Sequence, residues 1–221
     1  MVVSCWSVKG GSGTTVVAAA LALVLARRHD AGTLVVDLAG DLSAALGVPD
    51  PPGPGVARWA EARGDLPADA LGRLESPVAD GLSLLHRGEG GALVTEAGEL
   101  LSALLAMDDR RVVVDCGTLG PDDGHGSGSI PVAAGAEVSL LVTRPCYLAL
   151  RRAVAAPVTP TGIVLVDEPG RALDRTDVES VLGAPVVAEL RLDPGVARAV
   201  DAGLLASRLP RQLSRALQGA A

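Results

Sequence analysis

A glycine-rich stretch near the N-terminus has the residue types that bind phosphate groups. Its members are Lys9, Gly10, Gly11, Ser12, Gly13, Thr14 and Thr15. Glycines let backbone N–H groups turn toward an anion, and a following helix N-terminus adds its dipole. The hydroxyl of Thr15 is of a type that ligates Mg²⁺ in such loops. The stretch therefore predicts a phosphate-binding loop, with a glycine turn that only packs a helix onto a sheet as the alternative.

Two acidic residues are candidates for the same site. Asp37 and Asp115 lie at or near the ends of the apolar runs TLVVDL and RVVVDC. Ligands of parallel α/β sheets bind at the carboxyl ends of the strands, so we expect both carboxylates near the loop. A strand-end carboxylate can hold a water on Mg²⁺, and we therefore assign Thr15 and Asp115 as the metal-binding pair.

The elements that must position these residues alternate along the chain. Apolar, β-branched runs predict strands, and Ala/Leu-rich runs between them predict helices. The pattern indicates an α/β fold, with a mostly parallel, doubly wound sheet covered by helices on both faces, in a single domain spanning residues 1–221. The expected strands are 2–8, 33–38, 82–85, 111–116, 137–143, 163–166 and 186–190. The expected helices are 14–28, 56–63, 68–74, 95–107, 146–155, 175–182, 195–202 and 211–218, with loops at 49–55 and 117–129.

Composition narrows the range of partners. The 221 residues are 48% hydrophobic and carry a net charge of -7, which disfavours non-specific binding to DNA. Three widely spaced cysteines form no disulfide framework and indicate a reducing cytosol. The longest uncharged apolar run, residues 16–26, is too short for a bilayer, which takes about 20 residues.

Two basic segments allow alternative interpretations. The C-terminal segment 208–218 alternates leucine and arginine. A final packing helix is favoured over a membrane-binding helix, because the segment is short and lacks a bulky aromatic side chain. Arg144, Arg151 and Arg152 indicate a solvated helix face, with a basic partner surface as the alternative.

The glycine loop resembles the deviant Walker A motif, KGGxGK[ST], of the ParA/MinD family of P-loop ATPases. The likeness continues through LVVDLAGDLSAALG at 34–47, GLSLLHRG at 81–88, the Walker B-like VVVDCG at 112–117, and residues 183–203. The resemblance implies an ATP-dependent homodimer in which Lys9, the only lysine of the chain, reaches the partner's phosphates. It also implies a cytoplasmic protein that a protein partner can recruit to the membrane.

Three departures from the family pattern argue against ordinary ATPase activity. Thr14 replaces the lysine that meets the β- and γ-phosphates, so the loop loses a charge-assisted bond. The second carboxylate of the family's Asp-x-Asp is absent after Asp37, and Asp41 is a less favoured substitute. The Asn-Arg that contacts adenine is replaced by Asp167 and Glu168. We therefore expect ATP and Mg²⁺ to bind weakly or not at all, with Lys9 and Asp37 as the catalytic residues if the site is active.

These observations favour a non-catalytic, dimeric interaction module that positions or regulates a cell-division, membrane or pilus-assembly machine. A slow Mg-ATPase that switches between monomer and dimer is the alternative from the enzyme class. A P-loop ligase resembling dethiobiotin synthetase ranks third, because it too would need the missing lysine.

Overall fold

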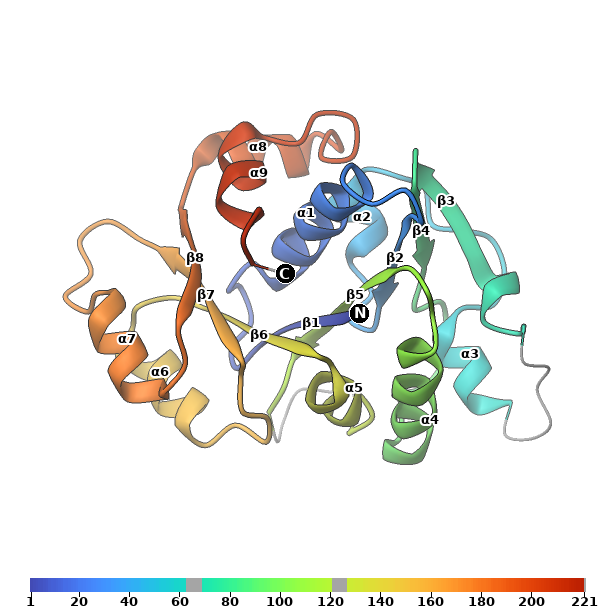
Figure 1. Cartoon of the computed structure of the whole chain (residues 1–221), viewed down its shortest axis with the longest axis horizontal. Helices are drawn as coiled ribbons and strands as arrows, with labels where there is room; N and C mark the ends of the chain where they lie inside the picture. The colour runs from blue at the N-terminus through green and yellow to red at the C-terminus, as the bar shows by residue number, and fades with distance from the viewer. Residues whose placement is uncertain (63–68, 121–126, 221) are drawn as a thin grey trace.

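Eight strands form one sheet in the computed structural model, which describes residues 1–62, 69–120 and 127–220 (Figure 1). They are β1 (Val2–Ser7), β2 (Thr33–Asp37), β3 (Glu75–Ala79), β4 (Leu82–Leu85), β5 (Arg111–Thr118), β6 (Val138–Thr143), β7 (Gly162–Asp167) and β8 (Val186–Arg191). Their order is β3-β4-β2-β5-β1-β6-β7-β8. Every neighbouring pair is parallel except β3 and β4, so the mostly parallel sheet predicted from the alternation is confirmed.

Helices cover both faces of the sheet (Figure 1). One face carries α1 (Thr14–Ala26), α2 (Leu42–Leu46), α8 (Pro194–Asp201) and α9 (Arg211–Leu217). The other carries α3 (Val56–Glu61), α4 (Thr95–Ala106), α5 (Ser129–Gly135), α6 (Tyr147–Val154) and α7 (Arg175–Leu182). A 3₁₀ turn at Gly72–Leu74 leads into β3. The doubly wound arrangement is therefore the one that the sequence predicts.

Burial on both faces explains why the central strands are continuously apolar. Side chains of β1 alternate between two clusters, with Val3 and Cys5 facing α1 and with Val2 and Trp6 facing the α4–α5 side. Helix α1 lies across the middle of the sheet and has no exposed residue, with ten of its residues buried. An Ala/Leu-rich helix that is apolar on every side fits such a buried position.

The structure differs from the sequence prediction in five short segments. The predicted helix at 68–74 is only the 3₁₀ turn in its described part, and the strand β3 that follows was not predicted. Helices α2 and α5 were also missed, and β5 extends to Thr118, two residues beyond the predicted end. The middle of the predicted 117–129 loop, residues 121–126, lies outside the described residues.

The C-terminal segment packs against the fold, as the favoured interpretation predicts. Leu209, Leu213 and Leu217 are buried, and they join the cluster that contains α1. Within the described residues, no helix has the length and hydropathy needed to cross a bilayer.

Candidate phosphate-binding site

The glycine loop connects the end of β1 to the start of α1. Gly11 and Gly13 have φ angles of 75° and 92°, a left-handed conformation that side chains other than glycine rarely adopt. A Cβ added at either residue would meet no atom within 4 Å, so the space above the loop is open. A hydrogen bond within the loop stabilises its turn, because the Ser12 hydroxyl donates to the Lys9 carbonyl oxygen at 2.8 Å.

Backbone amides at the start of α1 face this open space without protein acceptors. The first hydrogen bond of the helix runs from the Val17 amide to the Gly13 carbonyl at 3.0 Å. The amides of the first three helical residues, 14–16, have no acceptor in the described part of the chain, and no side chain caps them. Orphan N–H groups of this kind form an anion-binding cradle.

A cavity of about 360 Å³ lies over the loop, which is large enough for a small ligand. Its lining consists of Ser7, Gly10, Gly11, Ser12, Gly13, Thr14, Thr15, Val16, Ala39, Asp41, Gly117 and Thr118. The predicted loop residues are thus brought together, with the exception of Lys9, which is exposed to solvent outside the lining. Asp41 is the one charged side chain among the described lining residues, so this part of the cavity wall carries no cation.

Asp115 lies buried beneath the cavity, in the middle of the sheet. Its Oδ1 accepts a hydrogen bond from the Gly117 amide at 3.0 Å, while Oδ2 has no hydrogen-bond partner of acceptable geometry among the residues that the structure describes. Burial, and then the nearby Asp37 carboxylate, raise the pKa of Asp115 to about 7. The Thr15 hydroxyl is close enough to offset part of that rise. A buried carboxylate oxygen beside a hydroxyl is a donor pair that suits Mg²⁺.

Asp37 has a different environment, although it pairs in register with Asp115 on the neighbouring strand. Its two oxygens accept from the amides of Ala39 at 3.0 Å, Gly40 at 2.6 Å and Leu42 at 3.0 Å. Burial raises the pKa of Asp37, and these three hydrogen bonds oppose the rise. The carboxylate therefore stabilises the turn before α2, and its catalytic role stays a prediction.

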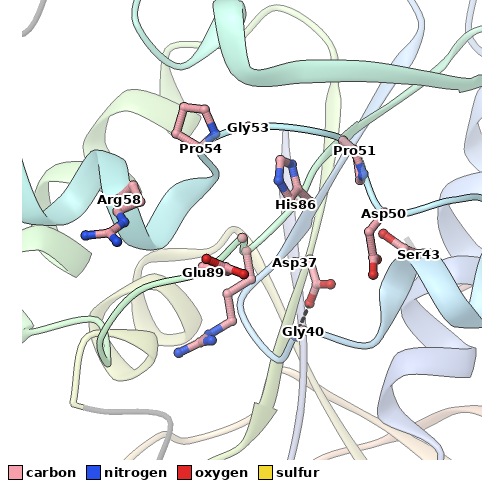
Figure 2. Close-up of a pocket in the computed structure, with 12 residues that line it drawn as sticks. Asp37, Gly40, Ser43, Asp50, Pro51, Gly53, Pro54, Arg58, His86 and Glu89 are labelled. Carbon is pink, nitrogen blue, oxygen red and sulfur yellow. Dashed lines mark hydrogen bonds between the residues drawn. The ribbon is translucent and has the colours of Figure 1, made fainter.

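A second and larger cavity lies on the other side of this turn (Figure 2). It has a volume of about 790 Å³, and Asp37, Gly40 and Ser43 form one of its walls, facing His86 at the end of β4. Asp37 thus lines this cavity, whereas Asp41 lines the one above the loop. The less favoured substitute for the missing carboxylate is therefore the residue that faces the phosphate cradle.

Arg144 contacts the loop and lies between β6 and α6, so the predicted solvated helix face is wrong for this residue. It follows β6, the strand beside β1, and its Nη2 donates to the Gly11 carbonyl oxygen at 2.6 Å. Arg151 and Arg152 are exposed on α6, as the solvated interpretation predicts. The signal that could have placed Arg144 was its position at the carboxyl end of a strand, where parallel sheets gather their functional side chains.

Comparisons with known proteins identify the fold. No protein-family model matches the chain, and no curated protein sequence matches it. A ParA family ATPase from Chlorobium tepidum TLS superimposes with a TM-score of 0.78 and 22% identity, over 98% of this chain and 95% of that one. The septum site-determining protein MinD from Pyrococcus horikoshii OT3, in complex with Mg-ADP, gives 0.73 and 19% over 98% and 92%.

A third match is the MinC:MinD cell division protein complex from Aquifex aeolicus, with a TM-score of 0.75 and 18% identity over 98% of this chain and 91% of the other. All three superpositions cover nearly the whole of both chains, so the agreement in fold extends well beyond the glycine loop. They confirm the ParA/MinD-like fold that the sequence motifs predicted. This chain therefore has the fold of the ParA and MinD P-loop ATPases.

Proposed function

We propose that this protein is a ParA/MinD-like dimeric interaction module whose phosphate site binds nucleotide weakly and turns it over poorly or not at all. The observation that carries the proposal is a cradle of free amides within a wall whose described residues include no cationic side chain. Such a cradle can hold an anion. Without a positive charge it lacks the main stabilisation of a phosphoryl-transfer transition state.

Nucleotide and magnesium remain the ligands of choice for this cavity. The MinD from Pyrococcus horikoshii was determined with Mg-ADP bound, and it shares this fold. Here Thr15 and Asp115 would hold the metal, because Asp115 has an unpartnered Oδ2 and the Thr15 hydroxyl lies near it. Loop residues 10–15 would hold the phosphates through their backbone amides. A bound metal would supply positive charge to the phosphate oxygens.

The same geometry argues against efficient hydrolysis. Thr14 is buried at the first position of α1 and brings only a hydroxyl to the cavity. Asp37 already accepts three backbone hydrogen bonds, and it lies in the wall of the other cavity. Neither residue can do in this arrangement what a lysine and a water-positioning carboxylate do in an active P-loop ATPase.

The role as an interaction module is supported by the fold and by the position of Lys9. The Aquifex aeolicus MinD was determined in complex with the cell division protein MinC, so a protein of this fold can bind a second protein. Lys9 points to solvent outside its own cavity, which suits a residue that reaches the phosphates of a second copy. We propose a homodimer of single-domain chains in the cytoplasm, recruited by a protein partner to a cell-division, membrane or pilus-assembly machine.

Titration calorimetry with Mg-ATP tests the proposed site. The natural protein is expected to bind weakly, and Thr14→Lys is expected to bind about tenfold more tightly or better, because it restores a charge-assisted bond. Thr14→Gln is the control for side-chain size without charge, and it should bind no better than the natural protein. Tight binding and steady turnover by the natural protein would refute the proposal.

A slow Mg-ATPase is the alternative function, and the position of Asp41 is the observation that favours it. Asp41 lines the cavity over the loop, where it could orient a water molecule. Single-turnover hydrolysis that is lost in Asp41→Asn, and retained in Asp109→Asn at an exposed position, would support this alternative.

A further inference from the structure

Arginine side chains lie beside the loop cavity, although no described residue of its lining is a cation. Arg144 donates from Nη2 to the Gly11 carbonyl oxygen at 2.6 Å, so its guanidinium is fixed against the glycine loop. A hydrogen bond from a charged donor to one of these carbonyls also stabilises the loop conformation. The contact joins positions 133 residues apart, which the pairing of β1 with β6 brings together.

Glu168 stands beside Arg144 and holds part of its charge. Arg144 Nη1 lies 3.8 Å from Glu168 Oε2, while Arg171 binds the same oxygen at 2.6 Å through Nη2 and at 3.0 Å through Nε. Arg171 first, then Arg144 and Lys9, lower the pKa of Glu168. Two arginines thus share one carboxylate next to the phosphate cradle.

Arg144 has hydrogen-bonding capacity left over. A guanidinium has five N–H donors, and here Arg144 makes one short hydrogen bond and one long ion pair. Its Nε is buried without an acceptor in the described part of the chain. The side chain is 34% exposed, so solvent and ligands can reach the guanidinium. Glu168 already has its closer partner in Arg171 and could release Arg144 at low cost.

We propose that Arg144 supplies the positive charge that the loop lacks at Thr14, and that Glu168 holds Arg144 at the cavity edge until a phosphate group replaces it. This proposal rests on the proposed nucleotide site and identifies Arg144 as the cation that would bind the phosphates there. In this arrangement the positive charge comes from the residue after β6 instead of from the first residue of α1. The planar guanidinium suits phosphate oxygens, with which it forms paired hydrogen bonds.

The test is calorimetric titration of the natural chain and its variants with Mg-ATP, tripolyphosphate and adenosine. Arg144→Gln is expected to weaken binding of both phosphate compounds about tenfold and to leave adenosine binding unchanged. Glutamine keeps an N–H donor for the Gly11 carbonyl, so the loss would report charge. Arg151→Gln removes the same charge from an exposed residue of α6 and is expected to bind as the natural chain does.

Glu168→Gln tests the competing carboxylate and is expected to tighten phosphate binding about threefold. Loss of affinity with added salt should also be less steep for Arg144→Gln than for Arg151→Gln. If the natural chain binds and Arg144→Gln binds equally well, the role of Arg144 is refuted while the proposed function stands. If only Glu168→Gln binds, nucleotide binding by the natural chain is refuted and the role of Arg144 is supported. If no variant binds, both are refuted.

Discussion

Replacing Asp115 by asparagine should stabilise the ligand-free protein above neutral pH. The carboxyl is fully buried, and one of its oxygens has no hydrogen-bond partner in the described part of the chain. Burial, and then the Asp37 carboxylate, raise its pKa from 3.8 to about 7. As pH rises, the unfolded chain loses this proton first, so the folded state becomes progressively less favoured between about pH 4 and about pH 7. The pKa difference corresponds to about 4 kcal/mol above pH 7 and to about 1.5 kcal/mol at pH 5.

Asparagine resembles the protonated carboxyl in shape and removes the charge. Urea denaturation of Asp115→Asn and the natural protein at about pH 5 and about pH 8.5 should therefore show a stability gain that grows with pH. Asp109→Asn, at an exposed position of the preceding turn, is the control and should change stability by less than about 0.5 kcal/mol. With Mg-ATP present the gain should become smaller, because ligand binding stabilises the natural protein, whereas the variant has lost a metal ligand. A gain that does not depend on pH, or a loss at high pH without ligand, would show that the buried charge is compensated.

The remaining predictions concern packing and ion pairs, and all are measured as free energies of unfolding in urea. Gly47→Ala should cost more than about 3 kcal/mol, because a Cβ there would collide with the backbone carbonyl of Gly203. Gly183→Ala, at a left-handed helix end with open space, should cost only about 1–2 kcal/mol, and equal costs would refute the steric argument. Arg110→Met, which loses two ion pairs at partly buried carboxylates, should cost about 2 kcal/mol, against less than about 0.5 for Arg73→Met at an exposed pair. Leu217→Ala should cost about 3 kcal/mol, since the side chain is buried against α1, and a cost below about 1 would mean that α9 is loosely docked.

The sequence predicts the central sheet well because each strand there is buried on both faces. Runs such as RVVVD have no polar alternation, and only a parallel sheet covered by helices gives them that environment. The longer helices α1 and α4 are predicted for a related reason, since their length and composition leave no alternative element. Their termini agree with the structure within one or two residues.

Short elements depend on tertiary contacts, so sequence patterns do not predict them. Helices α2 and α5 have five and seven residues, too few to be stable from local propensity alone. Strand β3 contains Pro77 and three polar or small residues, which together look like a loop. Proline is tolerated there because β3 is an edge strand, paired on one side only.

The candidate site is predictable to the extent that it depends on local motifs. The loop and the position of Asp115 follow from a strand–turn–helix pattern and from the strand-end rule. The contacts of Arg144 and Asp37 do not, because they depend on strand order and on the path of a turn after the strand. Neither the strand order nor the path of the turn can be predicted from the sequence. The sequence therefore does not predict that Asp37 and Asp41 line different cavities.

Helix α1, which follows the phosphate loop, has no exposed position at which a label could be attached. Ten of its residues are buried and none is exposed, so a probe attached anywhere along it would displace core packing. A spectroscopic label intended to report on the loop must be placed at Lys9 or after Ala26, at Arg27 or Arg28, where side chains reach solvent. For the same reason, stabilising this helix by design requires paired substitutions in the sheet or in α9, with volume conserved across the contact.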